Sequence, residues 1–244
     1  MKLGKRPATT DTRDLLFSAY YVAKLPPHPA KFGHESLVSA WQMLGNDTVG
    51  DCVFAGGAHE EMLWCAEGKS PAAFSTASVL SDYSAVTGYT PDDPNSDVGT
   101  DVRTALKYRV KTGLLDARGV RHKLGAYLKL EPGDTAHLLE ALYLFGAVGI
   151  GWQLPDSAQE QFSQGHVWSV VAGAQVEGGH YTPLVAQRTH GEVVTWGRVQ
   201  AFTTAFYETY CDEAWALLSP EILCGGKSPE GFDLAALTAD LKAL

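Results

Sequence analysis

The chain has 244 residues, of which 45% are hydrophobic and 19% charged, a composition typical of a folded globular protein. Nineteen basic against 28 acidic residues leave a formal net charge of −9, and no Lys/Arg run exceeds two residues, so we expect no nucleic acid partner. No apolar stretch approaches the roughly 18 residues that a membrane span needs, and the basic start lacks the apolar segment of a secretory signal. We therefore expect a cytoplasmic protein with no membrane partner.

The first part of the chain has helical periodicity. Residues 1–35 contain the Pro-rich run Leu25–Pro29 and predict an extended N-terminal arm. Apolar residues at helical spacing then predict four helices, at Asp51–Cys65, Thr76–Val86, Asp101–Thr112 and Asp134–Phe145. Gly56 and Gly57 lower the helix propensity of the first by roughly 1 kcal/mol each, and they allow another backbone to pack closely against it.

From Ala147 onward the pattern changes to strands separated by Gly-rich breaks. The predicted strands are Ala147–Leu154, His166–Val176, Tyr181–Gln187, Glu192–Val199 and Glu213–Leu218. Apolar residues at helical spacing in the tail predict a packing helix within 226–244. A helical first half followed by a mostly β second half predicts the α+β class.

Neither a cofactor nor a metal ion is expected from local motifs. The four cysteines, without a secretion signal, do not predict a disulfide framework, and no Cys-x-x-Cys or His-Glu-x-x-His spacing indicates zinc. The acidic run Asp93–Gly99 departs from a calcium loop, because Thr104 stands where the closing Glu belongs. The glycine-rich run Gly146–Gly151 follows a helix and enters a strand, the reverse of a dinucleotide-binding motif.

Cys52 is the cysteine whose position has chemical value. It begins the predicted buried helix, where the positive end of the helix dipole favours a thiolate, the nucleophilic form of the side chain. A small cysteine that fills the core is the structural alternative, and Cys65 on the same helix illustrates it.

A nucleophilic thiol needs a base, and His180 is one candidate among eight histidines. It follows two glycines at the start of an apolar strand, so it is accessible at a strand edge. His166 also begins a predicted strand. The residues by themselves leave the choice open.

The segment around Cys52 resembles the nucleophile segment of the papain-like cysteine peptidases. In that family an amide donor stands six residues before the cysteine and a glycine two residues before it. Asn46 and Gly50 occupy these places, with Asn instead of the usual Gln. Gly178-Gly179-His180 before an apolar strand resembles the family's histidine segment, and Trp196-Gly197 resembles the Trp-Gly pair on the strand after it. The similarity extends from about Pro26 to Pro220.

This resemblance implies an α+β, papain-like fold that needs no cofactor. A helical lobe at about 46–120 and a β-rich lobe at about 125–225 would flank the active-site cleft and form one unit, 36–225. The arm at 1–35 precedes this unit, and the packing helix at 226–244 follows it.

The resemblance also implies roles for individual residues. Cys52 would be the nucleophile and His180 the general base and acid. The amide of Asn46 and the backbone N–H of Cys52 would form the oxyanion hole, where a lost donor typically costs about 3–4 kcal/mol of barrier. Asp47 is the other candidate by register, but its carboxylate would repel an oxyanion. Trp196 would shield the histidine, and Gly99 would lie at the substrate cleft, where it can approach a peptide backbone.

Three features depart from the family pattern. The Asn that normally orients the histidine is replaced by Val194, and Thr195 replaces it only if the register shifts by one residue. The aromatic residue that usually follows the nucleophile is Val53. The cysteine that forms a disulfide near the nucleophile in secreted members is missing, as is a long propeptide.

The predicted function is that of a cysteine peptidase, or a related thiol acyl-transfer hydrolase, acting on a peptide or protein substrate. Val194 motivates the alternative, a catalytically silent papain-like domain that binds an assembly partner. The compact architecture resembles bacterial and bacteriophage members of the family. In the alternative interpretation, the domain would therefore serve as a structural component of a virion. An activated Cys52 would be alkylated by iodoacetamide faster than the remaining cysteines, which we interpret as core or bystander thiols: Cys65, Cys211 and Cys224.

Overall fold

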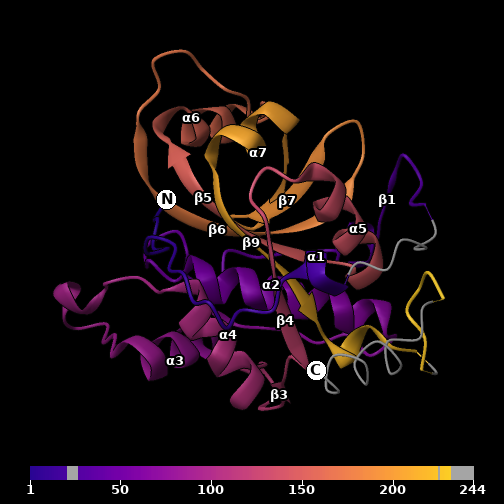
Figure 1. Ribbon diagram of the computed structural model, residues 1–244. Helices are drawn as coiled ribbons and strands as arrows, with labels where there is room; N and C mark the ends of the chain where they lie inside the picture. Colours follow the sequence, from indigo (N-terminus) through magenta and orange to yellow (C-terminus); the bar gives the residue numbers. More distant parts are fainter. Residues whose placement is uncertain (21–26, 225, 232–244) are drawn as a thin grey trace.

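The computed structural model describes residues 1–20, 27–224 and 226–231 (Figure 1). The α-helices are α1 (Phe17–Tyr20), α2 (Cys52–Glu67), α3 (Thr76–Thr87), α4 (Val102–Lys111), α5 (Thr135–Phe145), α6 (Asp156–Gln164) and α7 (Thr204–Tyr210). Three short 3-10 helices are η1 (Glu35–Leu37), η2 (Pro94–Ser96) and η3 (Pro220–Ile222). The strands are β1 (Phe32–Gly33), β2 (Leu114–Leu115), β3 (Arg121–His122), β4 (Ala126–Leu130), β5 (Val148–Pro155), β6 (Val176–Gln187), β7 (Gly191–Thr195), β8 (Arg198–Phe202) and β9 (Cys211–Leu218).

One antiparallel sheet organises the second half of the chain. Within the described residues it has seven strands, in the order β4-β9-β5-β6-β7-β8, with β1 paired to β6. Seven of the eight residues of β5 are buried, as expected for a strand inside the core. Trp152 on β5 faces His180 on β6 in the ladder, so a rigid central strand pair carries the candidate base.

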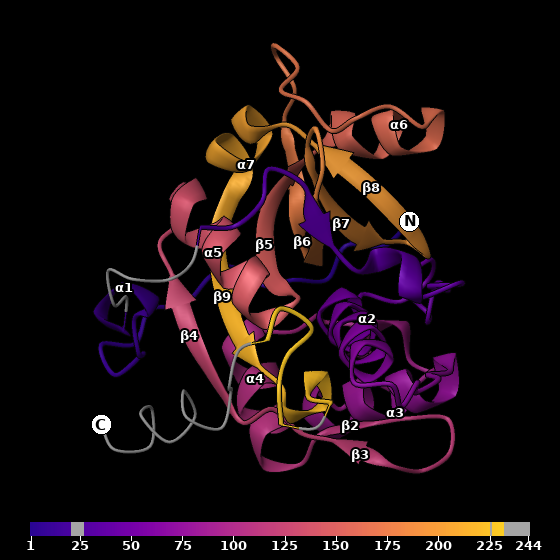
Figure 2. The ribbon, with the colours of Figure 1, turned by 90° about the vertical axis from the view of Figure 1, so that its right-hand side faces the viewer.

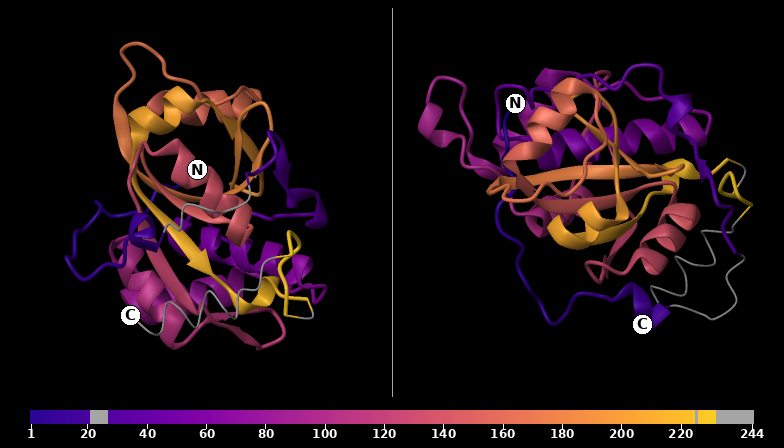
Figure 3. Two further views of the ribbon diagram at one scale, coloured as in Figure 1. Left: turned by 45° about the vertical axis from the view of Figure 1, so that its right-hand side comes forward. Right: turned by 90° about the horizontal axis from the view of Figure 1, so that it is seen from above.

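Helices α2, α3 and α4 form one part of the molecule, and the main sheet with α5, α6 and α7 forms the other (Figure 1). Figure 1 shows α2, α3 and α4 gathered below β5, β6 and β7, while β4 and the end of β9 extend down to the level of these helices; Figures 2 and 3 show the same arrangement from other sides. The N-terminus lies where the two parts meet (Figure 1). No helix in the described part of the chain is long and apolar enough to cross a membrane.

Helix α2 forms the centre of the helical part. Fifteen of its sixteen residues are buried, so packing rather than propensity or amphipathicity stabilises it. Gly56 makes room for Tyr181 of β6, since a Cβ there would lie 2.7 Å from a carbon of the Tyr181 ring. Gly57 faces the side chains of Leu114 and Arg109. The two glycines therefore accommodate side chains, and not a neighbouring backbone as the sequence suggested.

Buried charges connect α2 to its neighbours. Arg109 of α4 forms ion pairs with Glu60 and Glu61, the second with an N–O distance of 3.0 Å. The hydroxyl of Tyr181 donates to Glu60 at 2.7 Å. Because all of these side chains are buried, each charge depends on its partner to offset the cost of leaving water.

The four predicted helices are confirmed to within two residues at each end. The predicted strands at 147–154, 181–187 and 213–218 are also present, as β5, part of β6 and β9. The strand predicted at 166–176 is wrong: apart from an isolated bridge at Trp168 the segment is irregular up to Val176, and Val170 and Val171 are exposed. The strand predicted at 192–199 is instead a hairpin, because Trp196 and Gly197 have φ of 45° and 78° and reverse the chain between β7 and β8.

The predicted terminal segments are only partly described. The 1–35 arm contains α1 and β1, and the N-terminal residues before α1 lack regular structure, except for isolated bridges at Lys5 and Leu16. Most of the predicted packing helix at 226–244 lies outside the described residues.

Candidate active site

Cys52 and His180 line one small cavity between α2 and β6. Asn46, Thr195 and Trp196 line it as well, so the structure brings together five of the six residues singled out in the sequence. The cavity holds about 10 Å³, which is room for roughly one water molecule. Cys52 and His180 are each 1% exposed. The five residues share one cavity, and Cys52 and His180 are closed off from solvent.

The His180 ring is held from two directions. Its Nε2 lies 2.7 Å from the hydroxyl oxygen of Thr195, the last residue of β7. The ring stacks on Trp196 with centroids 4.7 Å apart and an angle of 21° between the planes. Nδ1 is buried without a hydrogen-bond partner among the described residues. Thr195, and not the apolar Val194, therefore supplies the polar group that contacts the His180 ring.

Burial keeps both groups neutral. It raises the pKa of the Cys52 thiol to about 12, although backbone groups of Tyr181 and Gly4 act in the opposite direction. It also lowers the pKa of His180 to about 3. The expected Cys52 thiolate is therefore disfavoured in this closed form, because burial of the sulfur is the largest influence on its pKa.

Asn46 lies at the site, but its amide is already engaged. Nδ2 donates to the carbonyl of Val49 at 3.1 Å and to the carbonyl of Lys2 at 3.3 Å. These two bonds use both hydrogens of the amide. An oxyanion bound at this site would have to replace one of them.

The N-terminal residues cover the thiol. The backbone N–H of Lys5 donates to the carbonyl of Gly179, the residue before His180, at 3.0 Å. The carbonyl of Gly4 accepts from Thr100 at 2.7 Å, and the N–H of Arg6 donates back to the Thr100 carbonyl at 2.9 Å. Residues 2–6 therefore lie in the cleft as an extended peptide, which we call the N-terminal segment.

Two further features fix this segment. Gly4 packs so closely that a Cβ on it would collide with the carbonyl of Gly50, and a Cβ on Gly99 would collide with the carbonyl of Gly4. The ammonium of Lys5 is buried and lies 2.8 Å from Asp212 and 3.0 Å from Glu213. Gly99, expected to approach a peptide backbone, thus contacts a backbone that belongs to its own chain.

Sequence reasoning did not identify the N-terminal segment as part of the site. Its functional residues are Gly4 and Lys5, and neither stands in a recognisable motif. The only available signal was the set of glycines at positions 4, 50 and 99, which lie far apart in the sequence and are brought together by folding.

Comparison with solved structures identifies the architecture. Xylellain, a cysteine protease from Xylella fastidiosa, superposes with a TM-score of 0.64 at 16% identity, over 89% of this chain and 96% of that one. The chain has the papain-like cysteine peptidase fold. Digestive procathepsin L2 from Tenebrio molitor matches with a TM-score of 0.56 at 13% identity, over 87% of this chain and 76% of that one.

A third papain-like match has lower sequence identity. The cysteine protease and lectin-like domains of Cwp84, a surface layer associated protein of Clostridium difficile, give a TM-score of 0.60 at 10% identity, over 80% of this chain and 53% of that one. No protein-family model and no curated protein matches the sequence. At these identities the likeness establishes the papain-like fold alone.

Proposed function

We propose that this chain is a cysteine peptidase that hydrolyses peptide amide bonds through Cys52 and His180. The observation that supports this most strongly is the hydrogen bond between His180 Nε2 and Thr195, because it leaves Nδ1 as the free nitrogen of a ring that lines the same cavity as the thiol. A papain-like fold with this pair at the junction of its two parts supports a peptidase rather than another hydrolase.

The chemistry follows from these positions. Nδ1 of His180 takes the proton of the Cys52 thiol, and the sulfur attacks the substrate carbonyl carbon. The amine leaves with that proton, and the resulting thioester is hydrolysed by water with the same imidazole as base. Asn46 and the backbone N–H of Cys52 stabilise the oxyanion once the amide of Asn46 has turned from its backbone acceptors.

Thr195 acts as the positioning residue for His180. When Nε2–H donates to the Thr195 hydroxyl, the ring is fixed in the tautomer whose Nδ1 carries the lone pair needed to accept the thiol proton. Trp196 limits rotation of the same ring by stacking on it.

Turnover requires the N-terminal segment to leave the cleft. An extended substrate would bond to the same backbone groups that the segment uses, at Gly179 and Thr100. Departure of the segment also admits water to Cys52, which lowers its pKa toward the ordinary value and increases its reactivity.

Hydrolysis of a fluorogenic peptide library tests this proposal. The wild-type chain is expected to release fluorophore, the Cys52→Ala variant to release none, and the Cys224→Ser variant to match the wild type, because Cys224 is an exposed thiol outside the site. Equal release by the wild type and Cys52→Ala would refute the proposal.

A second candidate is a catalytically silent papain-like domain with a binding role. It is favoured by the closure of the site, since both Cys52 and His180 are buried and the amide of Asn46 is engaged. Loss of the N-terminal segment separates the two candidates: a peptidase gains turnover, whereas a silent domain gains only an accessible thiol.

A further inference from the structure

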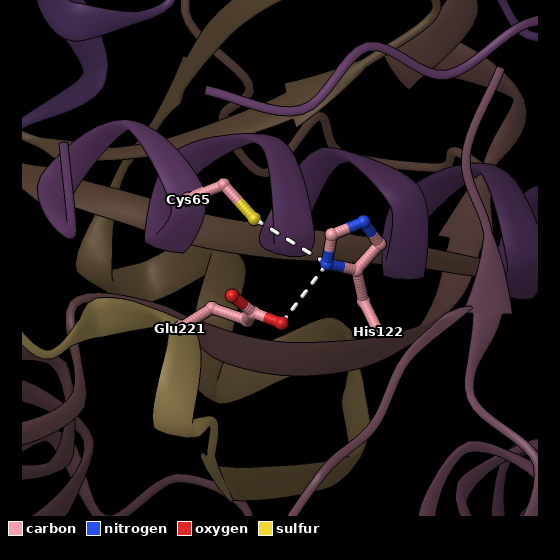
Figure 4. A group of neighbouring side chains, drawn as sticks. All are labelled: Cys65, His122 and Glu221. Carbon is pink, nitrogen blue, oxygen red and sulfur yellow. Dashed lines mark hydrogen bonds and ion pairs between the residues drawn. The ribbon is translucent and has the colours of Figure 1, made fainter. Parts of the chain in front are cut away.

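A second cluster of chemically reactive side chains lies at the far end of helix α2. Cys65 from α2, His122 from β3 and Glu221 from η3 converge there, and Figure 4 shows the thiol and the carboxylate directed at the same ring nitrogen. Cys65 stands thirteen residues after Cys52 on one helix, which separates the cluster from the catalytic thiol by about 20 Å. The proposed peptidase mechanism uses none of these three residues.

The distances match those between ligands of one metal ion. Sγ of Cys65 lies 3.6 Å from Nδ1 of His122, and Oε1 of Glu221 lies 3.0 Å from the same nitrogen. All three donor atoms lie within 4.8 Å of one another. In a tetrahedral zinc site, the usual Zn–S and Zn–N bond lengths put sulfur and nitrogen ligands about 3.5 Å apart.

Hydrogen bonding satisfies this cluster poorly. Nδ1 carries either one hydrogen or one lone pair, yet both the thiol and the carboxylate approach it. It can donate to Glu221 or accept from Cys65, but not both. A cation at the centre would bind the sulfur, nitrogen and oxygen atoms of the three side chains at once.

The second ring nitrogen of His122 supports the same interpretation. Nε2 of His122 is buried and has no hydrogen-bond partner among the described residues, but it lies 3.6 Å from Oδ2 of Asp116. Metal-bound histidines usually direct the second ring nitrogen toward a carboxylate, which fixes the ring and raises its basicity. Asp116 is itself anchored by the backbone N–H groups of Arg118 and Val120 at 2.8 Å.

The local charge also suits a cation. The carboxylates of Glu221 and Asp116 lie 3.0 Å and 3.6 Å from the two ring nitrogens of His122, so negative charge surrounds the cluster. A divalent ion would bind the Cys65 sulfur as thiolate, with release of the thiol proton. The side chain of Glu221 is 30% exposed, which gives the ion a path from solvent.

We propose that Cys65, His122 and Glu221 form a binding site for a zinc-type divalent cation. The mixed sulfur, nitrogen and oxygen donor set matches zinc, and cobalt(II) is a spectroscopic substitute in the same geometry. The bound ion joins the end of α2 to β3 and to η3, three segments distant in the sequence. The site is independent of the proposed peptidase function.

Cobalt titration of the metal-free full chain tests the site. One equivalent of Co²⁺ is expected to produce the ultraviolet charge-transfer band of a cobalt thiolate, and added Zn²⁺ is expected to abolish it. Cys65→Ser should remove the band, whereas the matched control Cys224→Ser should keep it. Asp116→Asn should weaken cobalt binding by about 10–100-fold without removing the thiolate band.

A carboxylate variant provides a second arm, in case Cys65→Ser fails to fold. Glu221→Gln alters a partly exposed side chain and is expected to weaken cobalt binding at least about tenfold, while Glu208→Gln on the exposed face of α7 leaves it unchanged. No charge-transfer band from the folded wild type at saturating Co²⁺, or a band that persists in Cys65→Ser, would overturn the proposal. Equal affinities for Glu221→Gln and the wild type would also overturn it.

Discussion

Thr195→Val removes the hydrogen bond that positions the proposed base while preserving the shape of the side chain. The Thr195 hydroxyl lies 2.7 Å from Nε2 of His180, and both residues are buried. Because valine opens no cavity, the main effect is an unpaired buried nitrogen, which costs about 1–3 kcal/mol. At about 1.4 kcal/mol per tenfold in rate, kcat/KM is expected to fall by about 5–150-fold.

The assay compares peptide hydrolysis by wild type, Thr195→Val and Thr195→Ser from pH 5 to 9. The loss should appear in kcat with little change in KM, because Thr195 holds the base and not the substrate. Thr195→Ser retains the hydroxyl and should recover most of the rate, while the pH profile of Thr195→Val should differ in the limb that reports the imidazole. A Thr195→Val enzyme within twofold of wild type, or a Thr195→Ser enzyme equally impaired, would refute the positioning role.

Three further predictions follow from the closed site and the buried charges. Gly4→Val collides with the Gly50 carbonyl and should displace the N-terminal segment, raising both the Cys52 alkylation rate and peptide turnover. In the wild type, alkylation of Cys52 should rise about tenfold per pH unit from pH 7 to 10, because burial places the thiol pKa near 12 and only the thiolate reacts. Arg109→Met leaves two buried carboxylates unpaired and should lower the free energy of unfolding by about 3–5 kcal/mol, measured by urea denaturation.

Two of these predictions have a matched control variant, and the alkylation profile has an outcome that would contradict it. Thr10→Val changes an exposed residue outside the cleft and should leave Cys52 alkylation unchanged. Alkylation of Cys52 that reaches a plateau by pH 7 would contradict the closed, neutral thiol. Lys107→Met on the exposed face of α4 should change the free energy of unfolding by less than about 0.5 kcal/mol. If Arg109→Met changed it by no more than Lys107→Met does, the buried ion-pair account would be contradicted.

Local patterns predicted the elements of this fold well where one face is buried. Helices α3, α4 and α5 each begin directly after a capping side chain, since Ser75, Asp101 and Asp134 each accept a backbone N–H of the first turn. The irregular segment at 166–176 was mistaken for a strand because its apolar residues look like a buried run. In the structure Trp168 packs into the core, whereas Val170 and Val171 face solvent.

Sequence motifs predicted residues that share one cavity, but not that this cavity is closed off from solvent. Motif spacing located Cys52, His180 and Asn46, which share one cavity in the structure. Thr195 rather than Val194 contacts His180 because of the hairpin at Trp196, where positive φ angles set the register of β7. Such a register depends on tertiary pairing and has no local sequence signal.

The raised thiol pKa also depends on long-range structure. It comes from burial beneath a segment nearly fifty residues away in the sequence, which a helix-dipole argument from neighbouring residues does not include. The Cys65, His122 and Glu221 cluster escaped motif analysis for the same reason, since its members come from three separate elements.

Trapping the acyl-enzyme tests the central claim most directly. The wild-type and Gly4→Val chains are incubated with a peptide ester, quenched with acid, digested and analysed by mass spectrometry for the acylated residue. The account predicts a thioester on Cys52 in both chains, formed faster in Gly4→Val and absent from Cys52→Ala. No acyl adduct in either chain, or an adduct on another cysteine such as Cys224, would contradict it.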